Sequence, residues 1–273
     1  AFALEARGKR AEARALYEQI LVAMPGHPGA LLRIARQHRE DGNLTAAREG
    51  LARALQSAQA MGLPPADIWL EFATLHATER DIAAACRAFG QAWSAAPGRL
   101  SALAGLERLA RALLDERRFD DAEACARVGL ERAADAAEAW HIAATVALGR
   151  GRLREAEAAC RRGLERAPRF VALLHLLGHV LKEAGALPAA RDALLAAIAA
   201  KPDDPDAQLT LGAVYLDLGR AEDALRHLRL DREHILRLPI KRVRPQMKPV
   251  GHIDKLGGDA QLIACAPHAA FQH

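Results

Sequence analysis

The sequence repeats itself with a period of about 34 residues, and this repetition limits the folds that the chain can adopt. Pro168 and Pro202 lie 34 residues apart, and the pair Leu177-Gly178 recurs in the same register at Leu211-Gly212. Self-similarity at a period of roughly 20–50 residues is typical of repeat architectures, in which each unit packs on its neighbours. We therefore expect a row of stacked units and not one compact core.

Six copies of the repeat follow one another after a partial copy at 1–27. The copies are 28–61, 66–99, 103–136, 137–170, 171–204 and 205–238, with insertions at 61–65 and 100–102. The same small residue stands early in the second half of the partial copy and of all six full copies: Ala13, Ala47, Ala85, Ala122, Ala156, Ala190 and Ala224. Because the distance between packed helices depends on the side chains at the contact, we expect these alanines at tight helix crossings.

Glycine marks the middle of most copies, and proline the end of several. The glycines are Gly8, Gly42, Gly151, Gly185 and Gly219, with Arg80 and Arg117 at the two other places, and the prolines are Pro25, Pro97, Pro168 and Pro202. Glycine suits a left-handed cap after a helix, and proline stops the next helix. Two helices of about 12–14 residues with two short turns fill such a copy, so each copy is predicted to be a helical hairpin.

Composition supports an all-α fold. Hydrophobic residues form 51% of the 273 residues but aromatic residues only 4%, so alanine and leucine must build most of the core. Both residues favour helices, and an all-β fold is excluded. No run of roughly 18 apolar residues indicates a membrane span.

The pattern of period, small residues, turn glycine and closing proline resembles the tetratricopeptide repeat family over roughly residues 1–230. The large aromatic residue expected early in each copy is kept only at Trp69 and Trp140. The resemblance implies an all-α, right-handed superhelical solenoid of antiparallel helix pairs. It also implies a concave face that holds a peptide or a partner protein.

The resemblance also implies which residues line the concave groove, because the family uses fixed positions of each first helix. The main candidates on these positions are Arg36, Arg39, Glu107, Arg111, His141, Thr145, His175, His179 and Lys182. The same positions add Asp67, Leu70, Thr74, Glu138, Asp206, Leu209 and Ala213. The Lys and Asn pair with which some members grip a terminal carboxylate is missing, so binding of chaperone C-termini is not expected.

Two hypotheses concern the chemistry of this groove. Arginine binds carboxylates through a planar fork, so Arg36 and Arg111 could favour an acidic partner segment; the alternative is that they are solvated side chains of a chain with 32 Arg and 6 Lys. His175 and His179 are one helical turn apart, and His141 occupies the equivalent position one copy earlier. Three imidazoles can bind zinc, but no carboxylate that would orient them can be identified. We expect a polar patch that responds to pH, with no metal and no cofactor.

The sequence indicates a protein–protein interaction scaffold and not an enzyme, because no catalytic or nucleotide-binding motif is present. An alternative that the resemblance allows is the non-catalytic repeat arm of a larger bacterial enzyme of sulfotransferase or glycosyltransferase type. The chain starts at Ala1 inside a repeat, so we expect it to be a fragment, and export is not excluded. Partner identity and oligomeric state are not encoded in any recognisable pattern.

Charge and cysteine usage add two weaker inferences. The formal net charge is +4, of which +3 belongs to residues 239–273, so the body of the protein does not favour nucleic-acid binding. The cysteines Cys86, Cys125, Cys160 and Cys265 form no C-x-x-C pair. We read them as small buried thiols in a reducing compartment, which favours the cytoplasm.

The tail at 239–273 departs from the repeat. The helical pattern weakens after Leu228, where Asp231 replaces a small or aliphatic residue, and we expect the second helix of the last copy to be lost halfway. Prolines then recur at Pro239, Pro245, Pro249 and Pro267. We predict a disordered basic extension; the start of a truncated domain and a frameshifted end are the alternatives.

Overall fold

The computed structural model describes residues 2–235, and the side chains of residues 3–228. This part of the chain is built from helices and short turns, and it contains no strand. Helices α1 (Phe2–Ala6) and α2 (Arg10–Ala23) come first. The following pairs are α3 (Pro28–Glu40) with α4 (Leu44–Ala60), α5 (Ala66–Thr78) with α6 (Ile82–Ala95), α7 (Ser101–Asp115) with α8 (Phe119–Ala133), α9 (Ala137–Gly149) with α10 (Leu153–Arg166), α11 (Val171–Glu183) with α12 (Leu187–Ala200), and α13 (Pro205–Asp217) with α14 (Ala221–Ile235).

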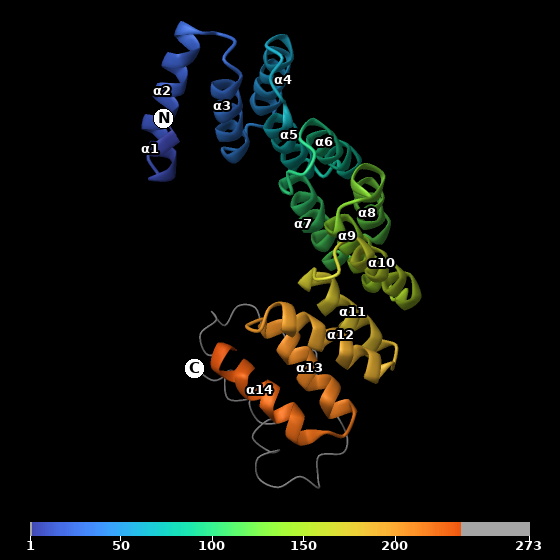
Figure 1. The fold of residues 1–273 in the computed structure, drawn as a ribbon. Helices are drawn as coiled ribbons and strands as arrows, with labels where there is room; N and C mark the ends of the chain where they lie inside the picture. The colour runs from blue at the N-terminus through green and yellow to red at the C-terminus, as the bar shows by residue number, and fades with distance from the viewer. Residues whose placement is uncertain (1, 236–273) are drawn as a thin grey trace.

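The helix pairs stack in chain order. Each first helix packs on its own second helix, and the first helices α3, α5, α7, α9, α11 and α13 contact one another in turn. Figure 1 shows the result as an elongated, curved array that runs from α2 to α14. The predicted all-α superhelical solenoid of antiparallel helix pairs is confirmed, and the first helices form one continuous layer on which a groove can be built.

Small residues let the helices approach closely. All seven repeat alanines, from Ala13 to Ala224, are 0% exposed, as the sequence predicted for tight crossings. Glycine serves the same purpose between α6 and α7, where a Cβ atom on Gly105 would lie only 2.1 Å from the ring of Phe89. The core is therefore thin but closely packed, and leucines such as Leu51 and Leu194 fill the spaces between the crossings.

The turns within the helix pairs share one left-handed residue. The five predicted turn glycines have φ angles of 73° to 80°, which confirms their role as left-handed caps. Arg80 and Arg117 adopt the same conformation, with φ angles of 62° and 61°. Because an L-residue with a side chain is strained in this region, the two arginines keep the turn at a cost in stability.

One expectation about the end of the repeats was wrong, and the two insertions differ in structure. The insertion at 61–65 forms a loop between α4 and α5, and most of the 100–102 insertion lengthens α7, which begins at Ser101. The second helix of the last pair is not lost halfway, since α14 continues to Ile235. The helix continues because no proline or glycine interrupts residues 229–235.

The division into a partial copy at 1–27 and six copies over 28–238 stays a prediction about repeat boundaries. The predicted disordered tail at 239–273 lies outside the residues that the structure describes. Among the described helices, none is both long and apolar enough to cross a membrane.

Candidate functional site

The predicted groove residues lie on the layer of first helices. Arg36 and Arg39 are on α3, and Glu107 and Arg111 are on α7. The others are on α9 (His141 and Thr145) and on α11 (His175, His179 and Lys182). They divide into a group near α3 and α5 and a group spread over α7, α9 and α11, and the two groups differ in chemistry.

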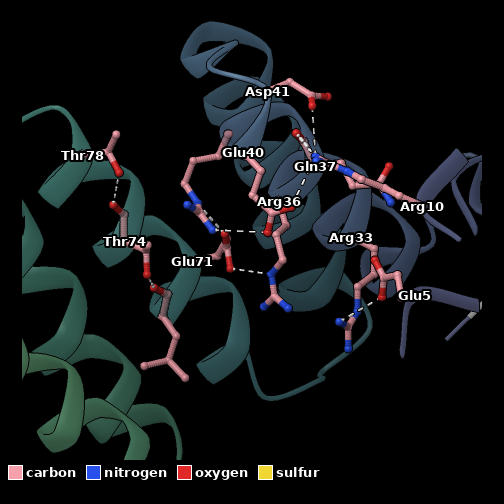
Figure 2. A network of polar contacts seen from close by, with 12 residues as sticks. Glu5, Arg10, Arg33, Arg36, Gln37, Glu40, Asp41, Glu71, Thr74 and Thr78 are labelled. Atoms are coloured by element: carbon pink, nitrogen blue, oxygen red, sulfur yellow. Dashed lines mark hydrogen bonds and ion pairs between the residues drawn. The ribbon is translucent and has the colours of Figure 1, made fainter. Parts of the chain in front are cut away.

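A buried carboxylate occupies the two arginines of the first group. Arg36 Nε donates to Glu71 Oε2 at 2.9 Å, and Arg39 Nε donates to Glu71 Oε1 at 2.7 Å. Figure 2 shows the Glu71 side chain facing Arg36, with a dashed line for their hydrogen bond. Glu71 is only 4% exposed. The two guanidinium groups are thus already engaged within the protein, which reduces the positive charge that they offer to a partner.

The burial of Glu71 could have been predicted from its spacing in the sequence, although Glu71 is not among the predicted groove residues. Glu71 stands three residues after Ile68 and four before Leu75, and both of these are buried. It therefore lies on the apolar stripe of α5. A charge in such a place must be paired, so its partners had to come from a neighbouring copy.

A polar cavity of about 460 Å³ lies beside α3, next to this ion-pair network. Its lining includes Arg33, which is 3.3 Å from Glu5 Oε2 on α1. Arg10 of α2 also lines it and donates to the carbonyl oxygen of Gln37 at 2.6 Å, and Figure 2 shows both contacts. This cavity could not be predicted from the groove positions, because α1 and α2 belong to the partial copy, which has none of those positions.

A second cavity, of about 340 Å³, joins the groove residues of the second group. Its lining comes from α7, α9, α11, α13 and the turns before α11 and α13: Glu107, Arg111, Glu138, His141, Phe170, Val171, Ala172, His175, Lys201, Asp204 and Asp206. Four of the main candidates therefore meet in one place with two of the additional positions, Glu138 and Asp206. Phe170, Lys201 and Asp204 were missed because they lie in turns or at helix ends, outside the positions that the resemblance supplied.

Charged groups line this C-terminal cavity in pairs. Glu107 Oε1 is 2.7 Å from Arg111 Nη2 on the same helix and 3.5 Å from His141 Nδ1 on the next first helix. Lys201 Nζ is 3.4 Å from Asp204 Oδ2. Glu138 and Asp206 add two more carboxylates to the lining, so the cavity contains more carboxylates than cationic side chains.

Burial keeps the histidines of this group neutral near pH 7. His141 is 7% exposed, and burial lowers its pKa although the neighbouring Glu107 raises it. His175 Nε2 is 3.0 Å from Thr210 Oγ1, and burial lowers its pKa as well. His179 also has a pKa lowered by burial, but it lies near Glu183 and does not line the cavity.

The structure does not bring three histidines together as metal ligands. No group of three His, Cys, Asp or Glu side chains within the described part of the chain is arranged to hold a metal ion. Of the other candidates, Thr145 buries its hydroxyl oxygen without a hydrogen-bond partner. Lys182 Nζ is 3.8 Å from Asp217 and 3.7 Å from Glu183. These two residues therefore stand apart from the C-terminal cavity.

The C-terminal cavity combines apolar and charged walls. Phe170, Val171 and Ala172 supply apolar surface at the start of α11, and Phe170 meets the His141 ring edge-on at a centroid distance of 6.3 Å. Carboxylates and neutral imidazoles face the remaining space. A few polar groups around an apolar floor can fix the register of a bound side chain.

Comparisons with known families agree with this architecture. A family model described as "TPR repeat" matches residues 178–219, and one described as "Tetratricopeptide repeat" matches residues 3–64 and 107–169. No curated protein sequence matches the chain.

Among solved structures, a chain of the APC/C hetero-tetramer Cut9-Hcn1 is similar with a TM-score of 0.51 and 15% identity, over 87% of this chain and 46% of that one. The MamA protein is similar with a TM-score of 0.47 and 20% identity, over 67% and 98% of the two chains. YrrB, whose structure is described as a TPR protein with an unusual peptide-binding site, has a TM-score of 0.46 and 18% identity, over 71% and 98%. The Cut9-Hcn1 likeness supports the helical-pair fold.

Proposed function

Because the chain belongs to the tetratricopeptide repeat family, whose arrays are protein-interaction scaffolds, we propose that it holds a segment of a partner protein in the groove formed by α7, α9, α11 and α13. One observation carries this proposal: side chains from four first helices line the same cavity of about 340 Å³. A pre-organised groove of this kind binds a segment with few anchors, since little of the protein has to be ordered on binding.

The lining favours a segment with one apolar anchor and neighbouring polar or basic groups. Phe170, Val171 and Ala172 offer the apolar contact, whereas Glu138 and Asp206 offer carboxylates. The acidic partner predicted from the arginines has less support, because Arg111 is 2.7 Å from Glu107 and the α3 arginines hold Glu71. The role that we propose is binding without catalysis.

Peptide selection on the immobilised chain tests this proposal. Peptides of 12 residues are selected from a random display library and their affinities measured by fluorescence anisotropy. Ala172→Arg places a long side chain in the cavity, and Ala196→Arg adds the same side chain at an exposed position of the second helix α12. We expect at least a tenfold loss of affinity with Ala172→Arg and none with Ala196→Arg. Selected peptides that bind both variants equally would place the binding surface elsewhere.

A further inference from the structure

Two cysteines that are distant in the sequence meet in the core. Cys86 is on α6 and Cys125 is on α8, and their Sγ atoms are 3.2 Å apart although 39 positions separate the residues. Both are buried, with exposed fractions of 2% and 0%. Spacing in the sequence gave no indication of this pair, because the contact joins the second helices of two successive helix pairs.

A glycine explains why these two second helices come so close. Gly90 stands one turn after Cys86 on α6, and a Cβ atom there would lie 3.1 Å from Val128 Cγ1 and 3.4 Å from Arg132 Cγ of α8. Val128 in turn follows Cys125 by three residues, so the two contacts lie along the same pair of helix faces. The absence of a side chain at Gly90 thus brings α8 onto α6 and the two sulfur atoms together.

We propose that Cys86 and Cys125 form a reversible disulfide site, which is oxidised by a hydroperoxide and cross-links two neighbouring helix pairs. The sulfur atoms are already in contact, so the new bond requires only a small approach of side chains that face each other. This inference does not depend on what the groove binds.

Where Cys125 donates the hydrogen bond that the two sulfur atoms share, the two thiols take different roles. A hydrogen bond from Cys125 lowers the pKa of Cys86, while the same bond and burial raise the pKa of Cys125. The Cys86 thiolate is therefore the first nucleophile. It attacks one oxygen of hydrogen peroxide, the O–O bond breaks, and hydroxide leaves while Cys86 becomes a sulfenic acid. Cys125 then attacks that sulfur, the S–O bond breaks, and water leaves; two thiols and one peroxide yield one disulfide and two waters.

Cys160 supplies a comparison within the same molecule. It is 0% exposed, and burial raises its pKa to about 12. Within the described residues it has no hydrogen-bonded sulfur neighbour of the kind that Cys86 has. Equal burial without a partner thiol should leave Cys160 reduced under conditions that oxidise the pair.

A cross-link at this position would join α6 to α8 and so restrict the angle between the α5–α6 and α7–α8 pairs. Closing a loop of 39 residues also removes conformational freedom from the unfolded chain. We expect the disulfide to raise the melting temperature by roughly 5–10 °C.

The experiment uses the full chain, fully reduced and folded in buffer without denaturant, and hydrogen peroxide as the oxidant. After quenching, free thiols are alkylated and the digested protein is analysed by mass spectrometry. We expect a peptide pair linked through Cys86 and Cys125, an alkylated Cys160, and a rise in melting temperature that dithiothreitol reverses. This measurement on the wild-type chain needs no variant, so it stands even where a substitution impairs folding.

Two variants sharpen the result. In Cys125→Ala, Cys86 has no resolving thiol and should accumulate as sulfenic or sulfinic acid, without the gain in melting temperature. In Cys160→Ala the linked peptide pair should form as in the wild type. A folded wild-type chain in which Cys86 and Cys125 remain alkylatable, a cross-link that appears only in urea, or linkage to Cys160 or Cys265 at equal yield would each overturn the proposal.

Discussion

Replacing Glu71 with alanine should lower the free energy of unfolding by about 2–3 kcal/mol. The Glu71 carboxylate is 4% exposed and accepts hydrogen bonds from Arg36 at 2.9 Å and from Arg39 at 2.7 Å. These bonds tie α3 to α5, so their loss acts on the packing of one helix pair on the next.

The magnitude follows from the exposure of the partners. Removing one member of a fully buried ion pair costs about 3–5 kcal/mol, because the remaining charge is left without compensation. Here the side chains of Arg36 and Arg39 are 35% and 18% exposed, so water can solvate part of the positive charge in the variant. The expected loss is therefore about half to two thirds of the fully buried value.

Urea unfolding followed by circular dichroism measures this loss, and hydrogen exchange locates it. Glu18→Ala is the matched control, since Glu18 pairs with Arg14 at 3.1 Å but its side chain is 56% exposed. We expect the control to change stability by no more than about 0.5 kcal/mol. Amide protection in Glu71→Ala should fall first in α3 and α5, because helix pairs of a solenoid depend on their nearest neighbours.

A double-mutant cycle isolates the direct interaction. The cycle of Glu71→Ala and Arg39→Ala should give a coupling energy of about 1–2 kcal/mol, because the two side chains share a charge-assisted hydrogen bond. A coupling energy near zero, or a Glu71→Ala loss no larger than that of Glu18→Ala, would refute the view that this carboxylate stabilises the α3–α5 contact.

Three further predictions concern a turn, a helix crossing and a histidine. Arg117→Gly should stabilise the fold by about 1 kcal/mol by relieving a φ of 61°, and Gly151→Arg should destabilise it by a similar amount; unchanged melting temperatures would contradict the strain. Gly105→Ala should lower the melting temperature markedly, because its Cβ would lie 2.1 Å from an aromatic ring, whereas Gly129→Ala, with its nearest neighbour at 3.8 Å, should not; equal shifts would argue against a tight crossing. Burial lowers the pKa of His141 below its ordinary 6.5, so the unfolded chain binds this proton more readily. The free energy of unfolding should therefore be unaffected by this group above about pH 6.5 and should fall below it by up to about 1.4 kcal/mol per pH unit. Urea titrations from about pH 7.5 to 5.5 measure the slope, and an identical slope in His141→Gln would exclude this histidine as its source.

Local features of the fold could be predicted because each copy repeats them. The alanines at the crossings and the glycines in the turns act within one helix pair, and both were found where the sequence placed them. The turn conformation even persists at Arg80 and Arg117, where the residue itself would not have indicated it. The packing of the pair imposes a left-handed residue there, whichever side chain it carries.

The groove could be predicted only in part. The resemblance supplied positions on first helices, and these include Glu107, Arg111, His141 and His175, which line one cavity. It did not supply Phe170 or Lys201, since these residues lie in turns and the family positions are all within first helices. Nor did it indicate that Glu71 engages Arg36 and Arg39.

The sequence alone determined the class of structure: a period near 34 residues, small residues at fixed places and helix-forming composition allow little besides stacked helical hairpins. The tertiary structure decided which side chains of different hairpins meet, as Glu71 meets the arginines of α3 and Cys86 meets Cys125. The physical reason is that the rotation of one hairpin on the next depends on the shapes of both surfaces, including single residues such as Gly90, and no pattern within one copy records that angle.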